Sequence, residues 1–104
     1  MASIHWTVGA GEDLREIVEY ISQDSATYAA TTVGRIVAAV ERLQRHPKLG
    51  RVVPEYGDKT IRELIVGGYR VVYRLRRQRI GIIAVVHGSR DLLRRLTDEP
   101  WDFG

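Results

Sequence analysis

The sequence predicts an α+β domain in the order β-α-α-β-β-β, with an antiparallel sheet packed on a helical hairpin. Three observations predict this class. Apolar side chains recur at helical spacing in residues 14–43, they change to alternating or continuous apolar runs in residues 61–87, and glycine or proline stands between these segments. The chain has 104 residues, of which 44% are hydrophobic. A chain of this length can form one hydrophobic core but is too short for two. We therefore expect a single domain over residues 1–104.

The first half of the chain is predicted to hold a short strand and two helices. Residues 4–8 have the length and β-rich character of a strand, and the Gly-Ala-Gly run at residues 9–11 breaks it. Ser25 is the expected N-cap of the second helix, which ends at residues 46–50 because proline resists continuation. The apolar face of the first helix is expected to be Leu14, Ile17, Val18 and Ile21. The buried stripe of the second is expected to be Val33, Ile36, Val37, Val40 and Leu43.

The second half is predicted to form three strands. Residues 61–66 and 69–75 pair as an antiparallel hairpin across the turn Gly67-Gly68. The run at residues 80–87 is apolar on both faces, which is typical of a central strand. Residues 90–96 can add a short C-terminal helix.

The composition disfavours several classes of function. The chain has no cysteine, which removes disulfides and thiolate chemistry, and its three histidines are dispersed, so we expect neither a metal nor a cofactor. The N-terminal residues lack the basic and apolar regions of a signal peptide, and no apolar run approaches bilayer-spanning length. We therefore expect a cytoplasmic protein with no membrane partner.

Positive charge is concentrated in the second half of the chain. Residues 1–50 carry five basic and six acidic side chains, net −1, whereas residues 51–104 carry eleven basic and seven acidic ones, net +4. Arginine favours bidentate contact with phosphate or carboxylate, so this half predicts an anionic partner, either nucleic acid or an acidic protein segment. A solvated surface is the alternative interpretation.

Two arginines of the predicted strand at residues 69–75 define a candidate binding face. Because side chains alternate along a strand, Arg70 and Arg74 share one face, and the face that carries the tyrosines is the better candidate for the core. Arg62 on the neighbouring strand can join them to line a concave anionic site. The alternative is that these arginines are solvated or paired with Glu63.

His87, at the end of the expected central strand, and the nearby Arg90 form a candidate catalytic pair. Histidine exchanges a proton near neutral pH, whereas arginine stays charged and can stabilise negative charge in a phosphoryl-transfer transition state. The competing interpretation is a structural histidine that only makes hydrogen bonds. The residues alone leave both open.

Short motifs follow one another in a specific order along nearly the whole chain. They are Trp6, Asp13-Leu14, Ile17, Tyr20-Ile21, Leu43, Pro47, Gly50-Arg51, Ile61-Arg62-Glu63-Leu64, Tyr69-Arg70-Val71-Val72-Tyr73-Arg74 and Val86-His87-Gly88-Ser89-Arg90. Each motif alone is weak, but in this order and spacing they resemble the RelE/ParE superfamily of bacterial toxins. The resemblance implies the same βααβββ fold and the toxin component of a type II toxin-antitoxin system.

The resemblance leaves two activities open. RelE-like members are ribosome-dependent ribonucleases that cleave mRNA, and their pattern would place Arg70 at the scissile phosphate, with Arg90 and His87 nearby. ParE-like members poison DNA gyrase and are not nucleases. This sequence has only Lys59 in the lysine region of the RelE-like pattern and no tyrosine after Tyr73, and its His-Gly-Ser-Arg ending is closer to ParE. The chain is an enzyme, an endoribonuclease, only in the RelE-like case.

We therefore expect a ParE-like toxin that inhibits growth by poisoning DNA gyrase. Target or antitoxin contacts are expected from Arg62, Arg70, Arg74 and Arg90. The resemblance implies a cognate antitoxin whose C-terminal segment wraps around the toxin in a hetero-oligomer. The alternatives are a RelE-like endoribonuclease acting on mRNA at the ribosome, with Arg70, His87 and Arg90 as catalytic residues, and a non-toxic basic nucleic-acid-binding module.

Overall fold

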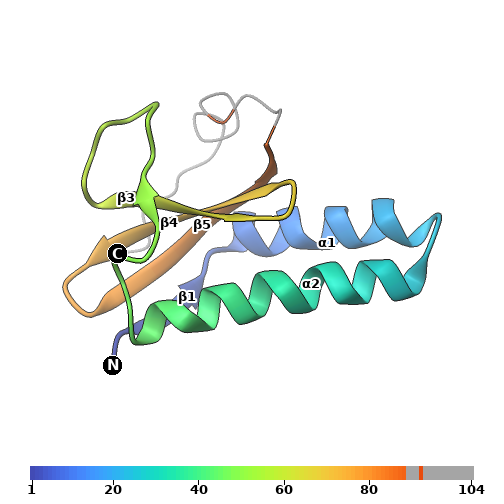
Figure 1. The fold of residues 1–104 in the computed structure, drawn as a ribbon, viewed down its shortest axis with the longest axis horizontal. Helices are drawn as coiled ribbons and strands as arrows, with labels where there is room; N and C mark the ends of the chain where they lie inside the picture. The colour runs from blue at the N-terminus through green and yellow to red at the C-terminus, as the bar shows by residue number, and fades with distance from the viewer. Residues whose placement is uncertain (89–91, 93–104) are drawn as a thin grey trace.

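The computed structural model describes residues 1–88 and Leu92, which form a helical hairpin and a five-stranded mixed sheet (Figure 1). The elements are β1 (Ser3–Trp6), α1 (Val8–Ser22), α2 (Ala26–Glu41), the 3-10 helix η1 (Arg42–Gln44), β2 (Arg51–Val52), β3 (Ile61–Val66), β4 (Tyr69–Arg76) and β5 (Arg79–His87). The strand order in the sheet is β1-β5-β4-β3-β2. The predicted α+β fold, with the helical hairpin packed on the sheet, is confirmed.

The first strand joins the sheet in a direction that the sequence did not indicate. β3, β4 and β5 pair antiparallel as expected, but β1 runs parallel to β5, with Ser3 opposite Arg79 and Trp6 opposite Ile82. Strands so far apart in the chain share no turn, so local turn chemistry cannot give their relative direction. The two-residue strand β2 was also not predicted, because it is too short to show an alternating pattern.

α1 begins earlier than its apolar pattern indicated. The expected break at residues 9–11 is wrong, because this Gly-Ala-Gly run lies inside the helix and β1 ends at Trp6. Thr7 is the cause. Its hydroxyl accepts a hydrogen bond from the Ala10 backbone N–H at 3.2 Å, which caps the helix, and donates to the Ile82 carbonyl oxygen of β5 at 2.9 Å. One side chain therefore ends β1 and begins α1.

We expect Thr7→Ala to lower the free energy of unfolding by about 1 kcal/mol, the typical effect of losing an N-cap hydroxyl. Urea unfolding followed by circular dichroism measures this change. Thr7→Ser keeps the hydroxyl and should stay close to the wild type. An alanine variant as stable as the serine variant would contradict the capping role.

α2 begins and ends near the predicted positions. The Ser25 hydroxyl accepts a hydrogen bond from the Tyr28 N–H at 3.0 Å, and helical structure continues through η1 to Gln44, before Pro47. The expected stripe contains buried and half-buried members: Ile36, Val40 and Leu43 are buried, and Val33 and Val37 are half-buried. Figure 1 shows that the hairpin extends beyond the sheet at its α1–α2 loop, so side chains near that loop are less fully covered.

Apolar side chains cover both faces of the sheet. The main core lies between the sheet and the helices, and its largest fully buried members are Ile36, Leu43, Tyr73, Ile80 and Ile82. A smaller core lies on the opposite face and comprises Val53, Ile61, Val72, Ile83, Ala84, Val86 and Leu92. The loop between β2 and β3 lies on the side of the smaller core (Figure 1). The tyrosine face of β4 is in the main core, as predicted.

β5 contributes to both cores, and a register shift interrupts its alternation between them. Val72 lies opposite Ala84, whereas the next residue, Tyr73, lies opposite Ile82. Ile83 is therefore an extra residue in β5, and both it and Ala84 belong to the smaller core while Ile82 belongs to the main one. Because apolar cores cover both faces of β5, residues 80–86 are all buried, which accounts for the continuous apolar run that predicted a central strand.

Only one residue of the expected C-terminal helix at 90–96 is described. Leu92 is buried in the smaller core, and the rest of that prediction lies outside the described residues. None of the helices among the described residues combines the length and the apolar character that a bilayer-spanning helix requires.

Candidate functional site

Two carboxylates hold the guanidinium of Arg70 on β4. Its two terminal nitrogens donate to the Glu55 oxygens at 2.7 and 2.8 Å, and its Nε donates to Glu63 Oε1 at 2.5 Å. Such a bidentate pair is among the stronger ionic contacts in proteins. The Arg70 side chain is only 11% exposed. The guanidinium expected to face an anionic partner is therefore satisfied by acids of the same chain.

Glu63 on β3 is the centre of this arrangement. Its side chain is fully buried, and its second oxygen accepts a hydrogen bond from Arg51 Nε at 2.6 Å. A carboxylate removed from water requires such partners, because an unpaired buried charge is strongly unfavourable. We call Arg51, Glu55, Glu63 and Arg70 the ion cluster. Its two positive and two negative groups sum to zero.

The ion cluster changes the ionisation of its members. Hydrogen bonds from Arg70 hold the pKa of Glu55 at about 2, below its usual value of 4.5, against a smaller opposing effect of burial. The same bonds to Glu55 are the largest cause of a raised pKa at Arg70. Both groups therefore keep their charges near neutral pH, and the pair contributes electrostatic attraction rather than proton exchange.

The stability contributed by Glu55 should be lost in acid. Because its pKa is lower in the folded state than in the unfolded state, the stabilisation is present above about pH 4.5 and disappears as the pH falls toward 2. We expect Glu55→Gln to be less stable than the wild type at neutral pH and the difference to shrink through this window. Urea unfolding at a series of pH values measures it, and a difference independent of pH would contradict the ion pair.

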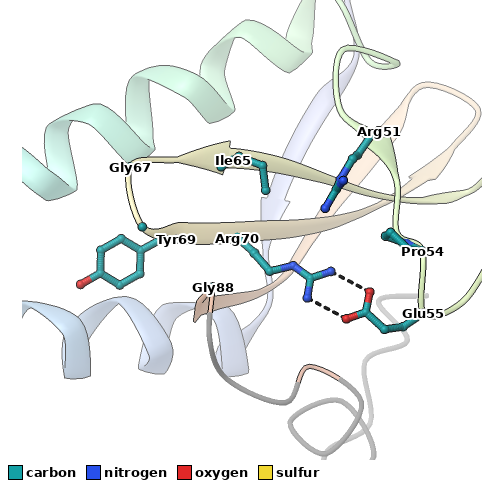
Figure 2. Close-up of a pocket in the computed structure, with 9 residues that line it drawn as sticks. Arg51, Pro54, Glu55, Ile65, Gly67, Tyr69, Arg70 and Gly88 are labelled. Atoms are coloured by element: carbon teal, nitrogen blue, oxygen red, sulfur yellow. Dashed lines mark hydrogen bonds and ion pairs between the residues drawn. The ribbon is translucent and has the colours of Figure 1, made fainter.

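A groove of about 500 Å³ opens beside the ion cluster (Figure 2). It is lined by Arg51, Pro54, Glu55, Ile65, Gly67, Gly68, Tyr69, Arg70 and Gly88. Figure 2 shows the side chains of Arg70 and Glu55 facing each other, joined by two hydrogen bonds. Gly67, with a φ of +58°, allows the tight turn at one end. Ile65 is 59% exposed, so the groove presents an apolar side chain beside a neutral group of charges.

Arg62 does not join Arg70 on one face, so this part of the prediction is wrong. Along β3, Glu63 occupies the face of Arg70, and the alternation places Arg62 on the opposite face. There Arg62 Nη1 donates to the Gly50 carbonyl oxygen at 3.0 Å, and its Nε donates to the Lys59 carbonyl oxygen at 3.0 Å. Arg62 therefore ties two loop segments to the sheet.

Arg74 follows Arg70 on the same face of β4 but has other neighbours. It lies near Asp58, whose pKa is lowered first by hydrogen bonds from Thr60 and to a smaller extent by the charge of Arg74. The predicted arginine face is thus divided between the ion cluster and this second acidic contact.

His87 is exposed at the end of β5. Its ring packs edge-to-face on the ring of Tyr69, with centroids 5.6 Å apart. Arg90, its predicted catalytic partner, lies outside the described residues, so the pair stays a prediction. In the described part of the chain, no group of three or more His, Asp or Glu side chains can hold a metal ion.

Sequence reasoning gave pairing with Glu63 only as an alternative, which the structure confirms for Arg70, and it missed Arg51 and Glu55. Glu63 had a detectable signal, because it stands between Ile61 and Ile65 on a face of a strand with an apolar pattern, where a charge needs a partner. Glu55 had none, since it lies in the loop between β2 and β3. Its contact with Arg70 depends on how that loop folds over the sheet.

Comparisons with known proteins agree with this architecture. The family described as the ParE toxin of the type II toxin-antitoxin system parDE matches residues 4–92. The chain belongs to this family. It is also similar to a solved chain described as the chromosomal ParDE TA system from P. aeruginosa, with 26% identity and a TM-score of 0.69, over 84% of this chain and 96% of that one. No curated protein matches it significantly.

The predicted RelE/ParE resemblance, closer to ParE, is thus confirmed. In this ParE toxin the ion cluster links three parts of the structure, since Arg51 comes from β2, Glu55 from the following loop, and Glu63 and Arg70 from β3 and β4. These bonds hold the loop against the sheet and give the groove a defined shape. The arrangement suits contact with a macromolecule better than acid-base chemistry.

Proposed function

We propose that this ParE toxin inhibits bacterial growth by poisoning DNA gyrase and that a cognate antitoxin neutralises it in a hetero-oligomer. The toxin acts in the cytoplasm, where gyrase works on the chromosome. It is a protein-binding inhibitor and not an enzyme.

We favour gyrase over mRNA as the target because the guanidinium of Arg70 is already bound by two carboxylates. In the RelE-like pattern the matching arginine contacts the scissile phosphate, which requires a guanidinium that can accept a phosphate. Here both terminal nitrogens of Arg70 already bind Glu55, and its Nε binds the buried carboxylate of Glu63. A phosphate would have to displace Glu55 and would then be repelled by Glu63. This supports inhibition through protein contact.

An antitoxin partner is supported by the family and by the surface of the helical hairpin. The similar P. aeruginosa structure is described as a toxin-antitoxin system. The hairpin exposes Val8, Tyr20 and Tyr28 at 80%, 73% and 60%. Tyrosines are enriched among the residues that dominate binding at protein interfaces. The hairpin therefore offers a suitable surface for a protein partner.

Gyrase assays with the purified toxin test the proposal. We expect the toxin to inhibit supercoiling and to accumulate gyrase-dependent DNA breaks. In cells that express the toxin without antitoxin, primer extension should find mRNA intact while growth stops. Co-expression of an antitoxin encoded beside the toxin should restore growth and form a complex that co-purifies.

The same experiments contain the outcomes that would overturn the proposal. Codon-periodic mRNA cuts that disappear in Arg70→Ala would assign the chain to the nucleases, provided that circular dichroism shows the variant to be folded. Unaffected growth with abundant folded toxin would favour the non-toxic nucleic-acid-binding module. Intact gyrase activity together with arrested growth would point to another target.

A further inference from the structure

The arginines at one end of the molecule come from two segments far apart in the sequence. Residues 41–45 end α2 and form η1, and residues 76–79 form the turn between β4 and β5. The N-terminal residues link them, because the Ala2 N–H donates to the Gln44 carbonyl oxygen at 3.0 Å and the Ser3 N–H to the Gln78 carbonyl oxygen at 2.8 Å. Figure 1 shows the N-terminus, the end of α2 and the β4–β5 turn at the same end.

This end of the molecule, which we call the basic end, accounts for the net charge of the protein. Its five exposed arginines are Arg42, Arg45, Arg76, Arg77 and Arg79. The two segments contain one acid, Glu41, so their net charge is +4. Because the whole chain carries +3, all other residues together carry −1. The positive charge therefore lies at the opposite end of β4 from the neutral ion cluster around Arg70.

Arg77 has an unusual backbone conformation for an arginine. Its φ is +47°, in the left-handed region that glycine and asparagine adopt more readily in hairpin turns. Strained residues of this kind gather at functional positions more than elsewhere. Here the strain places an arginine at the tip of a two-stranded β-hairpin.

We propose that the basic end binds the phosphate backbone of duplex DNA. Arginine pairs bidentately with phosphate oxygens, and most contacts between proteins and DNA are made to the backbone. The tip of the β4–β5 hairpin is flanked by β1 as far as Arg79 and by β3 as far as Arg74, so its arginines meet the phosphate backbone and no free ribbon enters a groove. Because η1 and the end of α2 lie at the same end of the molecule as this tip, Arg42 and Arg45 can add further contacts to the backbone.

An acidic protein segment is the competing partner, and the composition of the surface favours DNA. The centre of a protein interface is depleted in charge and enriched in apolar and aromatic side chains. Most large apolar side chains that the described residues expose lie elsewhere, on the helical hairpin and in the groove. Only Met1 and Leu49 lie near the basic end, where arginine dominates. The inference does not depend on gyrase, because the assay below contains only the toxin and DNA.

Fluorescence anisotropy of a short labelled DNA duplex with the purified toxin tests the proposal. We expect binding to weaken steeply between about 50 and 200 mM salt, because each neutralised phosphate releases counterions. Two double variants, Arg77→Asn with Arg79→Gln and Arg42→Gln with Arg45→Gln, should each reduce the salt slope by about 2 and weaken binding by about tenfold or more. Asparagine is chosen at position 77 because it tolerates the left-handed conformation.

Arg15→Gln with Arg35→Gln is the matched control, since it removes two exposed arginines from the helical hairpin. The control should keep the salt slope of the wild type. If the control binds DNA as weakly as the basic-end variants, the binding is not located at the basic end. If the wild-type toxin shows no salt-dependent DNA binding, the proposal is wrong. Binding to polyglutamate without binding to duplex DNA would assign the basic end to an acidic protein instead. Using two separate pairs keeps the proposal testable if one pair fails to fold.

Discussion

Glu63→Gln is expected to lower the free energy of unfolding by about 3–5 kcal/mol, the range observed when one partner of a buried ion pair is removed. Glu63 is fully buried and accepts hydrogen bonds from two guanidinium groups. Glutamine keeps the volume but offers one acceptor oxygen, so its amide NH2 group faces the donor of either Arg51 or Arg70. Because the Arg70 side chain is 11% exposed, water cannot replace the lost carboxylate. Urea unfolding at neutral pH measures the change.

Two further variants separate burial from charge. Arg51→Gln removes a bond to the same carboxylate, but the Arg51 side chain is 61% exposed, so we expect a loss below about 1 kcal/mol. The double variant Glu63→Gln with Arg70→Gln should lose less stability than the sum of the single variants, because it leaves neither charge buried alone. If Glu63→Gln unfolds at the same urea concentration as the wild type, the buried carboxylate is not what holds the ion cluster.

Local sequence patterns predicted the helices and the antiparallel strands because their signals lie within a few residues. Ser25 caps the second helix through a bond to the N–H three residues later, and the turn at Gly67 joins strands that are adjacent in the chain. The start of the first helix was misplaced because Thr7 is held by both Ala10 and the distant Ile82. The parallel pairing of β1 with β5 likewise depends on contacts across most of the chain.

The candidate site was harder to predict than the fold. Strand alternation correctly placed Arg70 and Arg74 on the face away from the main core. It could not show that Arg70 meets Glu55, because that acid lies fifteen residues earlier in a loop without a regular pattern. The sequence also showed that the second half of the chain is positively charged, but it did not show where on the folded surface the positive charge gathers. Only the folded structure shows that Glu55 and Glu63 neutralise Arg70 and that the unbalanced positive charge lies at the basic end.

Gly50→Ala is expected to lower the free energy of unfolding by about 3 kcal/mol, at the upper end of the usual effect of overpacking. A Cβ at this position would lie 2.5 Å from the Glu63 carbonyl oxygen and 2.7 Å from Tyr73 Cε1. Neither atom can move easily, since one is strand backbone and the Tyr73 ring is fully buried. The Tyr73 hydroxyl also accepts from the Gly50 N–H at 2.9 Å and donates to the Pro47 carbonyl oxygen at 2.8 Å. Displacement would therefore weaken two further bonds.

Gly34→Ala is the matched control, and its effect should have the opposite sign. Gly34 is exposed within α2, and a Cβ there would meet nothing within 4 Å, so alanine should stabilise the helix by about 0.5–1 kcal/mol. Urea unfolding of the two variants then separates close packing at Gly50 from the general preference of helices for alanine. A stable Gly50→Ala protein would mean that this segment does not pack on Tyr73 as described. Arg51 is the next residue and a partner of Glu63. The close contact between Gly50 and Tyr73 sets the path of the chain into β2, so the described position of Arg51 would then be wrong as well.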